Sequence, residues 1–185
     1  KDIHEALSQG TIGAVIIEPI QGRGGINIPP AGFLKNLQQI CNEHGALLVL
    51  DEIFTGLYRT GPSFACLQDD VRPDLLLIGK ALGGGLPIGA CVGRKEVMDA
   101  FGPSPGEATH TETFLGHPLT MASACAVLDV MNQGWIEESV KARGAQLEKI
   151  LRHNFSIFED KVFEVRGRGL MWGVEMRDAT ICKEI

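Results

Sequence analysis

The sequence is poor in positive charge and contains no long apolar run. Its 185 residues include 17 Lys and Arg against 23 Asp and Glu, which gives a formal net charge of -6 and an isoelectric point near 5.4. No basic run is longer than a dipeptide, and this argues against a nucleic-acid-binding surface. The apolar stretches are far shorter than the roughly 20 residues that a membrane-spanning helix needs. We therefore expect neither nucleic acid nor a membrane as a partner.

Signals for secretion, disulfide pairing and metal binding are missing as well. The polar start Lys1–Glu5 is followed by no apolar stretch, so we expect no signal peptide. The five cysteines are odd in number and form no CxxC pair, which favours buried thiols in a reducing compartment. His110 and His117 are seven residues apart, which is not a zinc spacing, and no acid or cysteine pattern joins them. We expect a cytoplasmic protein without a metal site.

The sequence does contain two short apolar runs that each end in one charged residue. Leu47–Leu50 ends at Asp51, and Leu75–Gly79 ends at Lys80; a turn that contains glycine follows each of them. Apolar runs of this length without polar alternation are typical of strands that are buried on both faces of a parallel sheet. In open α/β sheets, ligands bind outside the carboxyl ends of the strands. We therefore expect an acid and an amine at the edge of the sheet where such folds place their chemistry.

The rest of the chain alternates strand and helix patterns, which indicates an α/β fold. Further strands are predicted at 14–17, 90–93, 164–166 and 170–175, of which the first is β-branched and expected to be buried. Helices are predicted at 1–10, 94–101, 118–131 and 135–151. One more helix is predicted from Pro29–Pro30 to a cap at Gly45. Residues 102–112 have the composition of an exposed loop. The composition changes after about residue 155, so we expect 1–155 to be part of one large domain and 156–185 to begin a smaller one. The chain starts within a helix pattern and stops without a closing signal, and it is expected to be the middle of a longer protein.

Lys80 and Asp51 each allow two interpretations. A lysine at the end of an apolar strand can be partly buried, which makes it a nucleophile towards carbonyl groups, or it can extend from the loop as an ordinary surface lysine. The carboxylate of Asp51 can cap the following turn, or it can hold a cation. In a pyridoxal phosphate enzyme, a lysine forms a Schiff base and a carboxylate pairs with the protonated pyridine nitrogen of the cofactor. An acid and an amine at two strand ends fit that requirement, and they fit a salt bridge between neighbouring strands as well.

Two further features point weakly to close approach of a ligand, and other nucleotide and hydrolase motifs do not occur. The triplet Gly83–Gly85 removes side chains where a group must approach the backbone, or it is a flexible turn. Thr113 precedes a helix opened by Pro118, where a hydroxyl suits either a phosphate or ordinary helix capping. Gly167–Gly173 misses the dinucleotide pattern GxGxxG by one position, with Trp172 in place of the third glycine, and no GxSxG motif occurs.

Five blocks of sequence, in order along nearly the whole chain, carry a resemblance to a known family. The blocks are IIEPIQGRGG, LLVLDEIFTGLYRTG, RPDLLLIGKALGGGLPIGA, THTETFLGHPL and VRGRGLMWGVE. They resemble the class III pyridoxal-phosphate aminotransferases, the group of the ornithine, acetylornithine and 4-aminobutyrate aminotransferases. The resemblance implies a fold-type I large domain, with a mostly parallel sheet flanked by helices, and the start of an α+β small domain. It also implies pyridoxal 5'-phosphate as the cofactor and a homodimer with active sites at the subunit interface.

The resemblance assigns roles to five residues. Lys80 matches the lysine that forms the Schiff base and moves the proton between substrate and cofactor, and Asp51 matches the carboxylate on the pyridine nitrogen. Ile53 matches the aliphatic residue on one face of the cofactor ring. Thr113 matches the threonine whose hydroxyl reaches the cofactor phosphate in the partner subunit. Glu18 lies near the cofactor pocket in the family, and we assign no chemical step to it.

Two positions depart from the family pattern. Where ornithine- and aminobutyrate-type members often have a glutamine bonded to the phenolic oxygen of the cofactor, this chain has Phe54, which offers no polar group. Where many members have a glutamate that pairs with a substrate-binding arginine, this chain has Arg23, of opposite charge. Both changes point away from the familiar substrates and leave the chemistry of Lys80 unaltered. Arg23 is a candidate for binding a substrate carboxylate.

The resemblance predicts a transaminase that moves an amino group between an amino acid or amine and a 2-oxo acid. The alternatives are an aminomutase or racemase of the same family, and a truncated product that folds or dimerises without holding the cofactor. The family's amino-terminal phosphate loop and its carboxyl-terminal arginine for the substrate α-carboxylate fall outside these 185 residues. We therefore expect the core of the cofactor domain, which is not active alone.

Overall fold

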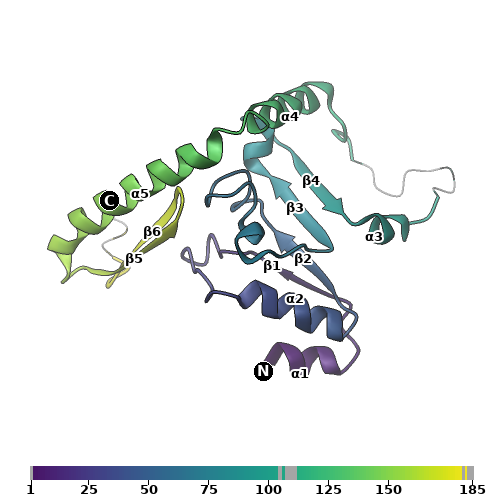
Figure 1. The fold of residues 1–185 in the computed structure, drawn as a ribbon, viewed down its shortest axis with the longest axis horizontal. Coiled ribbons are helices and arrows are strands. Elements are labelled where there is room, and N and C mark those ends of the chain that lie inside the picture. The colour runs from purple at the N-terminus through teal and green to yellow at the C-terminus, as the bar shows by residue number, and fades with distance from the viewer. Residues whose placement is uncertain (1, 104–105, 107–111, 181, 183–185) are drawn as a thin grey trace.

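Helices and strands alternate along the chain from α1 to α3, and a run of helices then leads to two final strands (Figure 1). The computed structural model describes residues 2–103, 106, 112–180 and 182. The elements in order are α1 (Asp2–Ser8), β1 (Ala14–Ile17), α2 (Phe33–Glu43), β2 (Leu47–Asp51), η1 (Ala65–Asp69), β3 (Leu75–Gly79), η2 (Lys80–Gly83), β4 (Gly89–Gly93), α3 (Lys95–Asp99), α4 (Pro118–Met131), α5 (Ile136–Phe155), η3 (Ser156–Phe158), β5 (Val162–Arg168) and β6 (Met171–Met176), where η marks a 3-10 helix.

A four-stranded sheet with the order β1-β2-β3-β4 forms the centre of the larger part. β1, β2 and β3 are parallel, and β4 runs antiparallel to β3. One face of this sheet packs against α1 and α2, which lie together on one side of β1 and β2 in Figure 1. Leu48 and Leu50 of β2 are buried there against Leu34, Leu37 and Cys41 of α2. The apolar stripe of α2 therefore forms the main core, as its helical spacing predicts.

β1 is less buried than its sequence indicates. Its residues alternate between exposed and half-buried, and Ile16 is 67% exposed. β1 pairs only with β2 in the described sheet, and only Val15 and Ile17 face the core that α2 covers. The expectation of a fully buried strand is therefore wrong for β1. It holds for the middle of β2, where Leu48, Val49 and Leu50 are all buried.

Several helix boundaries differ from the sequence prediction. α2 begins at Phe33 and not at Pro29–Pro30, because Gly32 takes a left-handed φ of 77° just before the first helical turn. α3 is shorter than the predicted 94–101, and α5 continues past the predicted end to Phe155. The predicted loop 102–112 lies largely outside the described residues.

Two buried carboxylates fix the frame of the larger part. Asp74, just before β3, accepts a hydrogen bond from the backbone N–H of Leu48 at 2.8 Å and one from Arg94 Nη1 at 2.7 Å. It therefore joins the start of β2 to the end of β4. Glu52, 1% exposed, follows β2 directly, and its partners belong to the site described below. Within the described ranges, no helix is long and apolar enough to cross a membrane.

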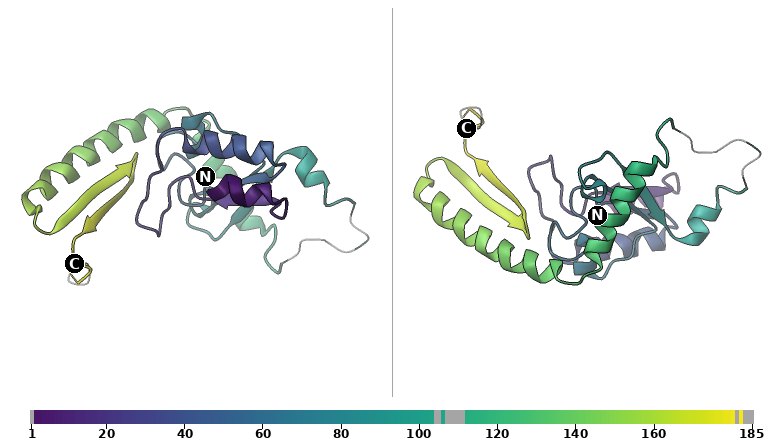
Figure 2. Two further views of the ribbon diagram at one scale, coloured as in Figure 1. Left: turned by 90° about the horizontal axis from the view of Figure 1, so that it is seen from below. Right: turned by 90° about the horizontal axis from the view of Figure 1, so that it is seen from above.

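α5 leads from the large sheet to a separate antiparallel hairpin, β5–β6, and both views of Figure 2 show α5 running alongside it. The hairpin turn contacts the loop that follows β2. The N–H of Leu170 donates to the carbonyl of Arg59 at 2.9 Å, and a Cβ built on Gly169 would lie 2.6 Å from the backbone carbon of Thr60. Gly144 of α5 is equally close, since a Cβ there would lie 2.7 Å from the carbonyl oxygen of Gly169. The division of the chain near residue 155 stays a prediction.

Candidate active site

The carboxyl ends of β2 and β3 bring Asp51 and Lys80 to the same edge of the sheet. The two strands are parallel, Asp51 pairs with Leu77, and Lys80 follows β3 directly. Asp51 is half-buried, and its Oδ1 accepts a hydrogen bond from the N–H of Ile53 at 3.0 Å. One carboxylate oxygen therefore caps the following turn, as one interpretation of the sequence predicts. Among the ion pairs of the described residues, none joins Asp51 to Lys80.

Lys80 has an unusual backbone conformation at this edge. Its φ is 42°, in the left-handed region that a residue with a side chain avoids, at a cost of roughly 1–2 kcal/mol. Strained residues of this kind cluster at functional sites. Lys80 is exposed, which favours the interpretation of an ordinary surface lysine over that of a partly buried one. Its Nζ lies 3.7 Å from the centroid of the Phe54 ring. The amine is therefore held on the face of an aromatic ring.

Ile53 and Gly79 lie beside each other where β3 meets Lys80. A Cβ built on Gly79 would lie 3.6 Å from both γ-carbons of Ile53 and 3.0 Å from the carbonyl oxygen of Ile88. A side chain at position 79 would therefore press on its neighbours. The aliphatic side chain of Ile53 borders the strand end that carries Lys80, and its role toward a cofactor stays a prediction.

Glu18 fixes the loop that lies against Phe54. Its Oε2 accepts the N–H of Gly22 at 2.9 Å, and a Cβ on Gly22 would lie 3.2 Å from the ring carbons Cδ2 and Cγ of Phe54. The ring of Phe54 is the same one that Lys80 Nζ contacts. Glu18 is therefore linked to Lys80 through two intermediate residues, which sequence spacing does not reveal.

Arg23 and Thr113 are both exposed. Arg23 follows Gly22 in the loop beside Phe54, whereas Thr113 lies in the segment before α4. Within the part of the chain that the structure describes, no hydrogen bond connects Thr113 to Lys80. The roles of both residues stay predictions.

The glycine triplet after Lys80 is approached by α4. Ser123 Oγ donates to the carbonyl of Gly83 at 2.7 Å, and a Cβ on Gly84 would lie 2.9 Å from Ser123 Oγ. Gly84 also has a left-handed φ of 57°. Close approach to the backbone therefore holds for Gly83 and Gly84, where the approaching group is a helix of the same chain, whereas a Cβ on Gly85 would meet nothing within 4 Å.

Sequence reasoning missed the role of Glu52. Its carboxylate accepts hydrogen bonds from Thr55 Oγ1 at 2.8 Å, the N–H of Ala65 at 2.8 Å and the N–H of Cys66 at 2.9 Å. It thereby ties the turn after Asp51 to the start of η1. Burial, and then the nearby Glu52 carboxylate, raise the pKa of the Cys66 thiol to about 12. The one signal in the sequence is a second acid next to Asp51 within an otherwise apolar run.

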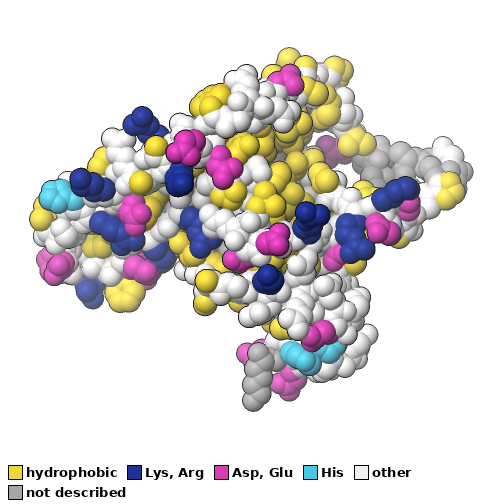
Figure 3. Space-filling view, viewed as in Figure 1, with side chains coloured by type: hydrophobic (Ala, Val, Ile, Leu, Met, Phe, Trp, Pro, Cys, Tyr) yellow, Lys and Arg dark blue, Asp and Glu magenta, His cyan; other side chains and the backbone are white. Residues whose placement is uncertain are grey.

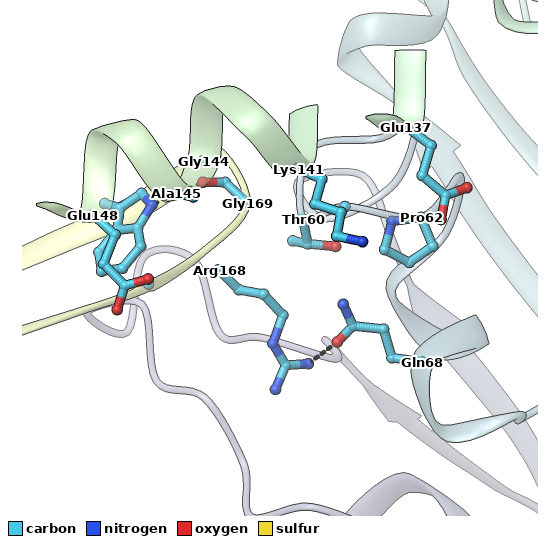
Figure 4. Close-up of a pocket in the computed structure, with 13 residues that line it drawn as sticks. Thr60, Pro62, Gln68, Glu137, Lys141, Gly144, Ala145, Glu148, Arg168 and Gly169 are labelled. Atoms are coloured by element: carbon cyan, nitrogen blue, oxygen red, sulfur yellow. Dashed lines mark hydrogen bonds between the residues drawn. The ribbon is translucent and has the colours of Figure 1, made fainter. Parts of the chain in front are cut away.

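A cavity of about 500 Å³ lies between α5, the loop 60–62 and the hairpin (Figure 4). Lys141 and Glu137 line it from α5, and Arg168 donates a hydrogen bond to Gln68, which also lines it. None of the site residues that the sequence predicts is among its lining residues. The cavity is therefore separate from the edge that carries Lys80.

Comparison with known proteins decides the family. The model of a family described as aminotransferase class-III matches residues 1–185. The chain belongs to the class III aminotransferases. Among curated relatives, the acetylornithine aminotransferase of Methanopyrus kandleri is 45% identical over 176 residues, which cover 95% of this chain and 43% of the relative. Ornithine aminotransferase 1 of Staphylococcus saprophyticus is 44% identical over 167 residues, which cover 90% of this chain and 41% of the relative.

Solved structures of aminotransferases share the fold. The ornithine aminotransferase of Toxoplasma gondii superposes with a TM-score of 0.87 at 41% identity, covering 96% of this chain and 41% of that one, and its structure shows partial occupancy of PLP at the active site. An (S)-enantioselective omega-transaminase of Thermomicrobium roseum superposes with a TM-score of 0.86 at 34% identity, covering 97% of this chain and 41% of that one.

These comparisons confirm the predicted family and the fold-type I class. Pyridoxal phosphate, expected from the resemblance, is the cofactor of the class III family. The chain spans less than half the length of the relatives it matches.

Proposed function

We propose that this chain forms the cofactor-binding core of a pyridoxal-phosphate-dependent aminotransferase, which moves an amino group between an amino acid or amine and a 2-oxo acid. One observation carries the proposal. Lys80, with its strained backbone, follows β3, and Asp51 ends β2, the parallel strand that pairs with β3. Family membership supports it. Lys80 and Asp51 then stand where the fold places a ligand.

The residues at this edge fit pyridoxal phosphate. Lys80 supplies an amine for its aldehyde, Asp51 supplies a carboxylate for its ring nitrogen, and a Cβ at Gly22 or Gly79 would crowd the neighbouring groups. When bound, the cofactor accepts the electron pair that is left at the substrate α-carbon. Lys80 Nζ would hold the cofactor through its aldehyde and would carry the proton that leaves the substrate α-carbon. Asp51 would keep the ring nitrogen protonated, and Ile53 would pack on the ring.

Labelling of Lys80 tests the proposal directly. The chain is incubated with pyridoxal phosphate and reduced with borohydride, and the modified peptide is identified by mass spectrometry. We expect one pyridoxyl group on Lys80, its loss in Lys80→Arg, and no change in Lys95→Arg, which removes a lysine whose side chain is 83% exposed. Label spread over surface lysines, unchanged by Lys80→Arg, would support the non-catalytic alternative.

Consumption of the amino acceptor separates a transaminase from an aminomutase or racemase. In the protein that carries this chain, a transaminase uses added 2-oxo acid in a one-to-one ratio with the amino donor. An aminomutase or racemase returns the amino group to the same skeleton and consumes none. Turnover without loss of the 2-oxo acid would contradict the proposed reaction.

We also propose a homodimer with shared active sites, in which Thr113 reaches the cofactor phosphate of the partner. Apolar side chains gather over α4 in Figure 3, and Phe114, Leu115 and Leu119 are 73%, 64% and 62% exposed. Phe114, Leu115 and Leu119 help to line a largely apolar cavity of about 680 Å³. An exposed apolar surface of this kind is typical of a protein interface. Sedimentation of Leu119→Glu should show monomers, whereas Ile157→Glu, at a 73% exposed position in η3, should leave the dimer intact.

We further propose that Arg23 binds a carboxylate of the substrate, because it is exposed next to the loop position that contacts Phe54. Arg23→Ala should then lower turnover of acidic amino donors more than turnover of neutral ones. Equal losses for both kinds of donor would contradict this role.

A cytoplasmic location is proposed on two grounds. All five cysteines are free, which fits a reducing compartment, although only Cys41 and Cys66 are buried and the expectation of buried thiols is wrong for the other three; the net charge is negative. Cell fractionation should place the protein in the cytosolic fraction without nucleic acid, and its recovery with membranes or outside the cell would contradict the proposal.

A further inference from the structure

The loop from Gln21 to Asn27 is closed on itself but carries strain next to its closing pair. Its two ends exchange backbone hydrogen bonds, from the N–H of Gln21 to the carbonyl of Asn27 and back, both at 3.1 Å. Ile26 takes a φ of 55°, which a branched side chain disfavours. Such a conformation persists only where surrounding groups hold it. Part of this support is internal, because the N–H groups of Gly25 and Ile26 both donate to the carbonyl of Gly22 at 3.2 Å, and part comes from outside the loop.

Arg166 of β5 supplies that support. Its Nε and Nη2 both donate to the carbonyl of Gly25, at 2.9 Å and 2.6 Å, although the two residues are 141 positions apart in the sequence. The other side of the guanidinium is taken by Glu164 and Glu175, which hold the pKa of Arg166 above its ordinary value, Glu175 contributing most. The side chain is 17% exposed. The carboxylates of Glu164 and Glu175 thus offset the charge of Arg166, while its Nε and Nη2 both donate to the carbonyl oxygen of Gly25.

The packing around this clamp is close on both sides. A Cβ on Gly25 would lie 3.1 Å from Arg166 Nη2, and a Cβ on Gly173 of β6 would lie 3.0 Å from the side chain of Ile26. Glycines at both positions therefore allow the hairpin and the loop to touch. A displacement of the hairpin would remove these contacts and leave the loop with its internal hydrogen bonds alone.

The base of the same loop supports the residue that holds the lysine. Gly22 lies against the ring of Phe54, and Lys80 Nζ lies on the face of that ring at 3.7 Å. The contacts therefore run without a break from Arg166 through the loop and Phe54 to Lys80.

We propose that Arg166 is a positioning residue of the active site, which holds the Gln21–Asn27 loop so that Phe54 keeps the Lys80 amine in place. The hairpin β5–β6 then sets the position of the reactive amine from outside the large sheet. The inference deepens the proposed function, since it rests on Lys80 as the residue that bonds the cofactor.

The experiment compares Arg166→Met with Arg177→Met. Arg177 follows β6, and its Nε also donates to a backbone carbonyl, that of Glu159 at 3.0 Å, so both variants lose the same charge and one anchor to the backbone. Arg166→Met should accelerate hydrogen exchange at the amides of Gly22–Asn27 about tenfold, and Arg177→Met should not. Arg166→Lys keeps the charge without the fork and should restore protection only in part.

The reactivity of Lys80 is read with a small acylating reagent, so that no cofactor is needed. An amine released from the ring of Phe54 offers more surface to the reagent, and Lys80 in Arg166→Met should acylate about threefold faster relative to Lys95. In Arg177→Met the ratio should not change. Pyridoxal phosphate labelling of Lys80 should become less selective in Arg166→Met alone.

The outcomes separate this inference from the proposed function. Unchanged exchange in Arg166→Met would overturn the clamp, and faster exchange with an unchanged Lys80 acylation ratio would overturn its link to the lysine. If the wild-type chain takes no selective label at Lys80 but Arg166→Met still raises its acylation, the proposed function fails and the positioning role stands.

Discussion

Gly169 allows the sharpest test of how the hairpin is docked. A Cβ at this position would lie 2.6 Å from the backbone carbon of Thr60, 2.9 Å from the carbonyl oxygen of Arg59 and 2.9 Å from the backbone nitrogen of Gly61. All three neighbours are backbone atoms, so no side chain can rotate away. Gly169 also has a left-handed φ of 58°. The substitution Gly169→Ala therefore forces the hairpin turn away from the loop after β2.

Two terms set the expected loss of stability. A left-handed alanine costs roughly 1–2 kcal/mol, and forcing an extra carbon into a packed contact costs about 1–3 kcal/mol. Together these predict that Gly169→Ala lowers the free energy of unfolding by about 2–5 kcal/mol. The matched control is Gly134→Ala, because Gly134 has a φ of 79° and nothing within 4 Å of its added Cβ. Only the first term, about 1–2 kcal/mol, applies to it.

Urea unfolding followed by circular dichroism and tryptophan fluorescence measures both losses. Trp172 is a suitable probe, because its Nε1 donates to the carbonyl of Gly169 at 2.8 Å. Gly169→Asn separates the two terms, since asparagine tolerates the left-handed conformation but still carries a Cβ. Equal losses in Gly169→Ala and Gly134→Ala, or a near-neutral Gly169→Asn, would refute the contact argument.

Two further predictions concern the buried Glu52 and its neighbours. The N–H groups of Ala65 and Cys66 and the hydroxyl of Thr55 all need acceptors, and Glu52→Gln places an amide there. This substitution should lower the free energy of unfolding in urea titrations by about 2–4 kcal/mol. A loss below about 0.5 kcal/mol would contradict the prediction. The pKa of Cys66 is raised from 9.0 to about 12 in the folded chain, so between these values the unfolded chain releases a proton that the folded chain keeps, and stability should fall as pH rises. Cys66→Ala should flatten that fall, and an unchanged slope from pH 8.5 to 10.5 would count against the raised pKa.

Local elements could be predicted from the sequence because their causes are local. The run Leu75–Gly79 forms β3 within its predicted bounds, and α4 begins at Pro118 and ends at Met131 as predicted, since proline suits the first helical turn. The meeting of Asp51 and Lys80 at one edge was also predictable, because parallel strands align their carboxyl ends. The family resemblance rested on the same contiguous blocks.

Contacts between distant segments were decided by the tertiary structure alone. The exposure of Ile16 depends on which face of the sheet a helix covers, and the burial of Glu52 depends on donors that η1 brings to it. Arg166 and Gly25 meet across 141 positions, and their glycine contacts exist only after the hairpin has docked. Periodicity specifies which residues face inward, but the partner that each one meets is set by the packing of whole elements. The sequence by itself therefore determined most of the strands and helices and the meeting of Asp51 and Lys80 at one edge of the sheet, and the packing decided that Lys80 lies on the ring of Phe54.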